Sequence, residues 1–185
     1  VIQRLTQSYE SGQITNGALV RELEERIAER LRVSHVVAVS SCTSGLMLVV
    51  QALVAGRPGP VVLPSFTFSA SAHAVHWNGR SPRFVDCDPA TFQMDLAHVE
   101  ASLGGASALM GTHVFGAPCA PESVEKLGAA AGLPVVFDAA HAIGATSNER
   151  PIGGFGEAEI FSLTPTKPMV GGEGGLIATR DRDLA

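Results

Sequence analysis

Apolar residues near the start of the chain follow a helical period. Between Gly17 and Arg32 they recur every four positions, with charged side chains between them: Leu19, Leu23, Ile27 and Leu31. This spacing predicts one helix with an apolar face that packs against the core or against another subunit. Thr15 or Asn16 is expected to cap the helix, because a side-chain oxygen there can accept from the first free backbone N–H groups.

After position 35 the pattern changes to short apolar runs separated by helix-length segments. Runs at 36–39, 61–63, 83–85, 108–110 and 135–137 alternate with predicted helices at 44–55, 67–77, 95–103 and 121–131. Strands that alternate with helices are connected by right-handed crossovers, which predicts an α/β fold with a mainly parallel sheet. Two further runs, 161–163 and 176–179, have no helix between them and predict a hairpin or an antiparallel edge.

Composition narrows the class of protein. The chain has 185 residues, of which 45% are hydrophobic and 17% charged, as in a globular protein. Its formal net charge of −5 argues against nucleic-acid binding. No apolar run is long enough to cross a membrane, and the polar opening predicts no signal peptide, so a cytoplasmic protein is expected. The cysteines, Cys42, Cys87 and Cys119, match no zinc or disulfide spacing and predict buried reduced thiols and no metal site.

Candidate chemistry collects where the predicted strands end, which is where parallel sheets bind ligands. The hydroxyl-rich segment 40–45 starts a helix, and such a helix start suits a phosphate, although an ordinary cap is equally consistent. Asp138 follows a buried run, so it either pairs with an internal cation or accepts from a protonated ring nitrogen. His141 could orient Asp138 or be a core histidine. His113 ends another strand, and Phe66 or Phe68 could face a planar ring.

Lys167 lies in a turn between Pro165 and Pro168, and glycines follow at 171–175. A lysine that forms a Schiff base must lose its proton near neutral pH, which a partly dry pocket favours, whereas an exposed turn lysine is the ordinary alternative. A phosphate cradle, an aromatic face, a carboxylate and a lysine together are what pyridoxal phosphate (PLP) requires.

Six stretches carry a resemblance to a known family: 41–46, 63–68, 84–89, 113–116, 138–142 and 161–167, followed by the glycines at 172–175. Their residues and order resemble the DegT/DnrJ/EryC1/StrS aminotransferases, which are fold-type-I PLP enzymes acting on nucleotide-linked keto-sugars. The resemblance implies a three-layer α/β sandwich, with an arm and helix at 1–34 and a PLP-binding large domain at 35–185. It also implies that the smaller C-terminal domain is absent from this chain.

The resemblance assigns roles residue by residue. Lys167 matches the Schiff-base lysine and Asp138 matches the carboxylate that pairs with the pyridine nitrogen. Phe68 matches the aromatic residue that stacks on the cofactor, and His141 matches a position beside the ring. The phosphate-holding positions are matched by Thr43, Ser44 and Ser162. Cys42 departs from the family, which more often has Gly or Ala there.

The implied reaction is amino transfer from an amino acid, by family analogy glutamate, to a nucleotide-linked keto-sugar, in an enzyme that is a homodimer when full length. Two alternatives stay open. One is another fold-type-I PLP enzyme, such as a lyase or desulfurase. The other is a non-catalytic fragment or regulatory protein that keeps the PLP fold.

Overall fold

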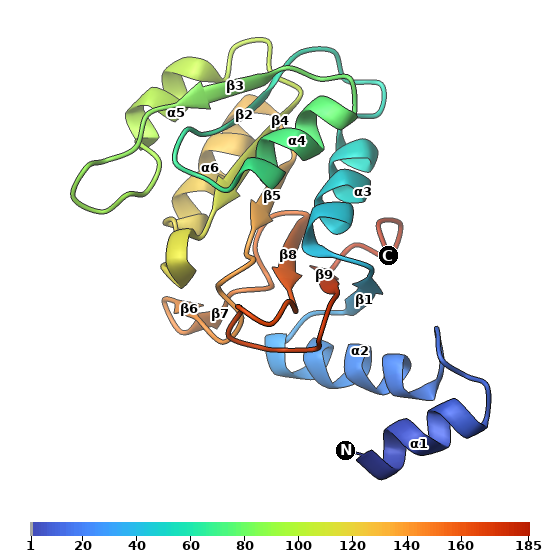
Figure 1. Ribbon diagram of the computed structural model, residues 1–185. Coiled ribbons are helices and arrows are strands. Elements are labelled where there is room, and N and C mark those ends of the chain that lie inside the picture. The colour runs from blue at the N-terminus through green and yellow to red at the C-terminus, as the bar shows by residue number, and fades with distance from the viewer. Residues whose placement is uncertain (1) are drawn as a thin grey trace.

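A seven-stranded sheet forms the middle layer of the computed structural model, which describes residues 2–185 (Figure 1). In spatial order the strands are β1 (His35–Val39), β9 (Gly175–Thr179), β8 (Ala158–Ser162), β5 (Val135–Asp138), β4 (Ala108–Thr112), β2 (Val61–Pro64) and β3 (Pro82–Val85). Strands β8, β5, β4, β2 and β3 pair in parallel, and β9 runs antiparallel to both β8 and β1. The predicted parallel sheet and the predicted antiparallel pair are therefore both confirmed.

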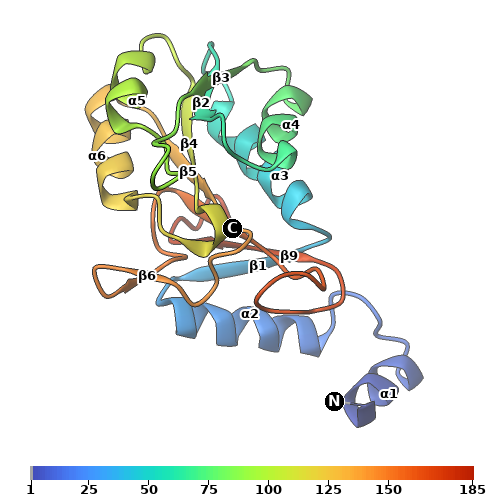
Figure 2. The same cartoon turned by 60° about the vertical axis from the view of Figure 1, so that its left-hand side comes forward.

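Helices cover both faces of the sheet and make the three layers that the sequence predicts (Figure 2). Helices α3 (Cys42–Val54) and α4 (Ser69–Trp77) cover one face, and α2 (Ala18–Leu31), α5 (Leu96–Ser102) and α6 (Pro121–Ala131) cover the other. Successive strand residues alternate between these faces: Val61 and Leu63 pack with α3, whereas Val62 packs on the opposite side. Because both faces are buried, the strands read as unbroken apolar runs.

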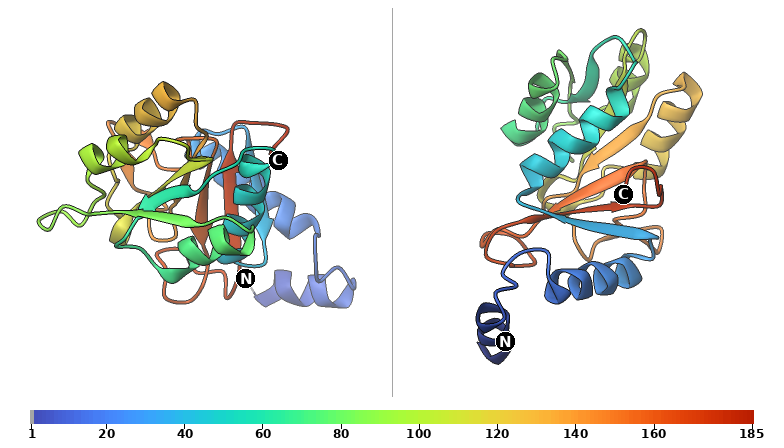
Figure 3. Two further views of the ribbon diagram at one scale, coloured as in Figure 1. Left: turned by 90° about the horizontal axis from the view of Figure 1, so that it is seen from above. Right: turned by 90° about the vertical axis from the view of Figure 1, so that its right-hand side faces the viewer.

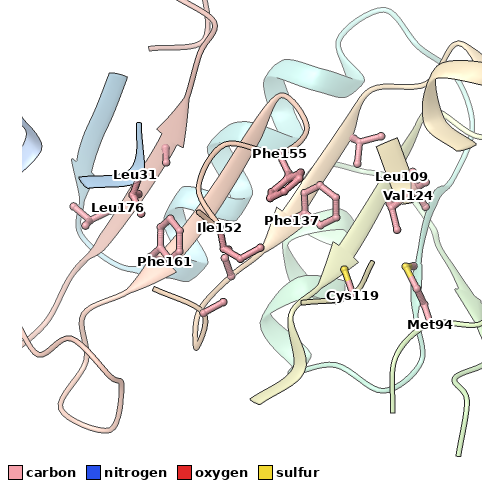
Figure 4. Packing of buried hydrophobic residues seen from close by; sticks show 14 of the residues in the cluster. Leu31, Met94, Leu109, Cys119, Val124, Phe137, Ile152, Phe155, Phe161 and Leu176 are labelled. Atoms are coloured by element: carbon pink, nitrogen blue, oxygen red, sulfur yellow. The ribbon is translucent and has the colours of Figure 1, made fainter. Parts of the chain in front are cut away.

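The core beneath α2, α5 and α6 is built from large side chains of the central strands (Figure 4). Phe137 lies beside Phe155, and Phe161 lies between Leu176 and Ile152 (Figure 4). All five side chains are at most 1% exposed. On the other face, Gly45 lets α3 approach the sheet closely, since a Cβ there would lie 2.9 Å from Cγ2 of Ile160.

The N-terminal segment differs from the prediction in two respects. A first helix, α1 (Ile2–Glu10), precedes α2; it has no buried residue and extends away from the rest of the chain (Figure 3). Its Arg4 side chain forms an ion pair with Glu22 of α2. The predicted cap is wrong, because Gly17 is the N-cap of α2 and makes no side-chain hydrogen bond.

The segment between β5 and β8 is held close to the core. It contains a two-stranded ribbon of β6 (Thr146–Ser147) and β7 (Arg150–Pro151). Elsewhere in the chain, a short 3-10 turn, η1 (Val114–Gly116), follows β4. Across residues 2–185, every helix is too short or too polar to traverse a lipid bilayer.

Candidate active site

A cavity of about 510 Å³ opens at the edge of the sheet where β1, β2, β4, β5 and β8 end. Six strands point their carboxyl ends toward this edge, because β1 and β8 both run antiparallel to β9. The lining residues follow these strand ends: Ser41, Cys42, Thr43, Phe66, Thr67, Phe68, Ala70, Thr112, His113, Val114, Phe115, Asp138, Ala140, His141, Ser162, Thr164, Thr166 and Lys167. The structure thus brings together six of the seven predicted site residues, and Ser44 is the exception.

Asp138 is the last residue of β5 and is 4% exposed. Its Oδ2 accepts from Ser71 Oγ at 2.7 Å, and its Oδ1 accepts from the backbone N–H of Ala140 at 3.1 Å. These two bonds offset part of the cost of burying a carboxylate and fix the plane of the carboxyl group. Asp138 also lines the cavity, so it can accept a further hydrogen bond from a ligand.

Lys167 lies in the turn that connects β8 to β9. The base of the turn is closed by backbone hydrogen bonds from Leu163 to Gly174 at 3.0 Å and from Gly171 to Leu163 at 2.8 Å. Within the turn, the backbone N–H of Lys167 donates to the carbonyl of Thr164 at 3.0 Å. The half-buried ammonium group is thereby directed into the cavity, where Nζ lies 2.7 Å from Nε2 of His141.

His141 follows β5 by three residues and is half-buried. Burial lowers the pKa of its imidazole, the charge of Lys167 lowers it further, and the charge of Asp138 opposes this. The ring is therefore neutral near pH 7, and Nε2 accepts a hydrogen bond from Lys167 Nζ.

The start of α3 forms the part of the cavity wall that follows β1. Ser41 caps the helix by accepting from the backbone N–H of Ser44 at 3.0 Å, and Ser44 Oγ accepts from the backbone N–H of Ser41 at 3.0 Å. This reciprocal capping box uses the Ser44 hydroxyl within the loop, which explains why Ser44 does not line the cavity. Thr43 does line it. Gly175 allows the close fit to β9, since a Cβ there would lie 2.5 Å from Cys42 N.

Ser162 ends β8 on the same side of the cavity and is 3% exposed. Its Oγ accepts a long hydrogen bond from the backbone N–H of Thr164 at 3.4 Å. The hydroxyls of Thr43 and Ser162 therefore both reach the cavity next to the N-terminus of the 13-residue helix α3. Free backbone N–H groups and the helix dipole favour an anion at such a helix start.

Three phenylalanines line the open side of the cavity. Phe68 is the most informative, because it precedes α4 and is 73% exposed, unlike a core residue. Phe66 and Phe115 form an edge-to-face pair with ring centroids 6.1 Å apart, and Phe115 lies 6.2 Å from the ring of His141. Exposed aromatic faces at a cavity mouth offer stacking surfaces for a planar ligand.

His113 borders the cavity, yet both of its ring nitrogens are used inside the protein. Nδ1 accepts from the backbone N–H of Cys119 at 3.1 Å, so the hydrogen is on Nε2, which donates to Glu159 Oε1 at 2.8 Å. Both side chains are fully buried, and the imidazole stacks on Phe137. His113 is therefore a satisfied core histidine.

The thiols are inert where the structure buries them. Burial raises the pKa of Cys42, the charge of Asp138 raises it further, and Lys167 opposes both, so Cys42 contributes a neutral thiol to the cavity. Burial, with a smaller contribution from the charge of Glu159, raises the pKa of Cys119 to about 12. The third cysteine, Cys87, is half-buried, in contrast to the prediction that all three are buried.

Sequence reasoning missed several hydroxyl residues of the site, and three of them lie near Asp138 in one hydrogen-bonded group. Thr67 and Thr112 line the cavity, and the fully buried Ser71 holds Asp138. The position of Thr112 at a strand end was a usable signal. Nothing in the pattern distinguishes Ser71 from any other serine of a helix, because its importance depends on the packing of α4 beside β5.

Known proteins resemble this chain in sequence and in fold. The profile of the DegT/DnrJ/EryC1/StrS aminotransferase family matches residues 1–185. Spore coat polysaccharide biosynthesis protein SpsC of Bacillus subtilis (strain 168) is 35% identical over all of this chain and 48% of its own length. A UDP-N-acetyl-3-dehydro-alpha-D-glucosamine 3-aminotransferase of Acidithiobacillus ferrooxidans is 37% identical over 89% of this chain and 45% of its own length.

Among solved structures, DesI in the presence of its TDP-sugar product superposes with a TM-score of 0.91. It is 43% identical, and the match covers 100% of this chain and 47% of that one. The chain thus spans about half the length of the curated relatives it matches.

Proposed function

The chain belongs to the DegT/DnrJ/EryC1/StrS aminotransferase family, and from this premise we propose that its cavity binds PLP and serves amino transfer to a nucleotide-linked keto-sugar. The observation that carries the proposal is the meeting of Lys167 and Asp138 in one cavity. These residues come from different strand ends, and their chemistry is complementary: one supplies an amine, the other an acceptor for a ring N–H group.

The residues present fit such a cofactor. Asp138 is a buried carboxylate held by two donors and still faces the cavity, which suits a protonated pyridine nitrogen. Thr43, Ser162 and the start of α3 would hold the phosphate, and Phe68 would stack on the ring. When bound, PLP supplies the electron sink that amino transfer needs.

Lys167 would bind the cofactor covalently and move protons during the reaction. A lysine can do this only after Nζ has lost a proton. Neutral His141 accepts a hydrogen bond from Nζ at 2.7 Å, which holds the end of the lysine side chain in place. We therefore assign His141 to orienting Nζ within the cavity.

The substrate class follows from the relatives. The 3-aminotransferase relative is named for a UDP-linked dehydro-sugar, and DesI was solved with its TDP-sugar product. We propose a nucleotide-linked keto-sugar as amino acceptor and an amino acid, glutamate by family resemblance, as amino donor. We also propose that the full-length protein is a homodimer.

The decisive experiment uses the two lysines of the chain. After incubation with PLP, the wild-type protein is expected to show the visible absorbance of lysine-bound PLP, and Lys167→Ala is expected to lose it completely. Lys126→Ala is the matched control, because Lys126 is exposed on α6, away from the cavity. An unchanged band in Lys167→Ala would contradict the assignment.

A half-reaction separates amino transfer from the alternatives. Glutamate should bleach the band of the wild-type protein, and a nucleotide-linked keto-sugar should restore it. A lyase or desulfurase would release a product from its own amino acid without this cycle. A protein that binds PLP and does not respond to any amino donor would be a non-catalytic member of the fold.

A further inference from the structure

A chain of hydrogen-bonded hydroxyl groups runs along the cavity wall and ends at Asp138. Thr112, the last residue of β4, contacts Thr67 in the loop after β2, with 3.1 Å between the two Oγ1 atoms. Thr67 Oγ1 lies 2.8 Å from Ser71 Oγ of α4, and Ser71 Oγ lies 2.7 Å from Oδ2 of Asp138. One network therefore connects four separate segments of the fold.

Counting the hydroxyl hydrogens shows that all the hydrogen bonds of this hydroxyl chain point in one direction. Ionised Asp138 can only accept, so the one hydroxyl hydrogen of Ser71 points to Oδ2. Thr67 must then donate to Ser71, which uses the only hydrogen of Thr67. Thr112 must in turn donate to Thr67. Hydrogen bonds aligned in one direction polarise one another, so each hydroxyl strengthens the next bond toward the carboxylate.

We propose that Ser71 is a positioning residue that orients Asp138 toward the cofactor ring, supported by Thr67 and Thr112 as upstream donors. This inference rests on the proposed PLP site. Ser71 is fully buried and does not line the cavity, so it acts through Asp138 and touches no ligand. Its bond to Oδ2 and the Ala140 bond to Oδ1 stop rotation of the carboxyl group.

The direction of the chain also determines which ligand groups this wall accepts. Thr67, Thr112 and Asp138 all line the cavity, and all three hydroxyl hydrogens of the chain are used inside the protein. The side chains of Thr67, Thr112 and Asp138 therefore offer hydrogen-bond acceptors only. A ligand group that donates, such as a protonated ring nitrogen, fits there, and a group that only accepts does not.

The first test measures PLP binding by titration of its absorbance in the wild type, Ser71→Ala and Ser71→Thr. Loss of one hydrogen bond to a charged group should raise the Kd of Ser71→Ala roughly tenfold. Ser71→Thr keeps the hydroxyl and should restore binding. Ser107→Ala is the matched control, because Ser107 is equally buried and donates to the carbonyl of Pro60 at 3.1 Å, away from the cavity.

The second readout reports on Asp138 and not on stability. With PLP labelled with ¹⁵N in the ring, the nitrogen chemical shift of the wild type should be that of a protonated ring. In Ser71→Ala it should move toward the unprotonated value, whereas Ser107→Ala should match the wild type. Thermal unfolding of each variant checks that the fold is intact. A ring-nitrogen shift and a Kd in Ser71→Ala equal to those of the wild type would overturn the proposal.

The third test addresses the direction of the hydrogen bonds in the hydroxyl chain. Thr112→Val keeps the side-chain shape and removes the first donor, so it should weaken PLP binding by a smaller factor, roughly twofold to threefold. In a double-mutant cycle its effect should disappear when Ser71 is already Ala, because the chain is then interrupted. Fully additive effects of the two substitutions on PLP binding would refute the proposed coupling along the hydroxyl chain. Failure of the wild type to show the PLP band would instead refute the proposed function, so the two outcomes are separable.

Discussion

Two histidines at the same edge of the sheet show how similar positions acquire different roles. His113 directly follows β4, and His141 follows β5 by three residues. Both ring nitrogens of His113 are occupied by Cys119 and Glu159, and the side chain is fully buried. His141 is half-buried, contacts Lys167 through one nitrogen and faces the cavity. A strand-end histidine is thus a candidate for chemistry only when one nitrogen stays accessible.

The partners of the two histidines differ in the same way. Glu159 accepts from His113 Nε2 and from the backbone N–H groups of Gly153 and Phe155, so its charge is fully used to hold the segment between β5 and β8. Lys167 contacts His141 and lines the cavity. One pair therefore stabilises the fold, and the other leaves an amine available to a ligand.

The largest expected effect concerns the buried pair of His113 and Glu159. Glu159→Ala leaves His113 and two backbone N–H groups without an acceptor and should lower the free energy of unfolding by about 3–5 kcal/mol. His141→Ala should lower it by less than about 1 kcal/mol, because no buried group loses its partner. Urea unfolding monitored by circular dichroism measures both. Similar losses in the two variants would remove the distinction drawn between the pairs.

The next largest effect concerns Phe68, on the open side of the cavity. Phe68→Ala should weaken PLP binding by roughly threefold to tenfold, as expected for the loss of an aromatic stacking partner. It should leave the unfolding midpoint nearly unchanged, because Phe68 is 73% exposed. Phe84→Ala provides the control, since Phe84 is 49% exposed and does not line the cavity. Equal PLP affinity in both variants would exclude Phe68 as the stacking residue.

The smallest effect is a pH dependence of stability. The folded pKa of His141 is below its ordinary value because of burial and the charge of Lys167. As the pH falls through the ordinary histidine range, His141 takes up a proton in the unfolded chain but not in the folded chain. This group therefore makes the protein less stable as the pH is lowered. Unfolding at about pH 7.5 and about pH 5.5 should show a larger loss for the wild type than for His141→Asn. A larger loss in the variant would reverse the sign of the argument.

Much of the fold follows from the sequence because strands buried on both faces give apolar runs that stand out against amphipathic helices. The predicted strands at 36–39, 61–63, 108–110 and 135–137 are all confirmed, as is the antiparallel pair of β8 and β9. Helix ends were less predictable. Helix α1 has no buried face, and the N-cap of α2, Gly17, makes no side-chain hydrogen bond, so neither feature leaves the pattern that sequence reasoning looks for. The division at position 34 stays a prediction.

The candidate site was predictable where its residues stand at strand ends. Asp138 was found in this way, Lys167 from its turn between two prolines, and Ser162 from the family resemblance, and the structure places all three around one cavity. Ser44 could not be separated from its neighbour Ser41, because only the capping geometry shows which hydroxyl is used within the loop. Ser71 and Glu159 gain their partners through tertiary contacts, which no local pattern reveals.

The position of β9 between β1 and β8 has a consequence for the order of folding. Within residues 2–185, β1 lies at the edge of the sheet and pairs with β9, so that His35 lies opposite Thr179, which is far away in the sequence. Pairing over such a separation is slow, because a long loop must close before any contact forms. During synthesis β1 must therefore wait for β9 to leave the ribosome. The helix start that follows β1 and the turn that carries Lys167 can meet only once β9 has been made, so the binding site cannot form before that step.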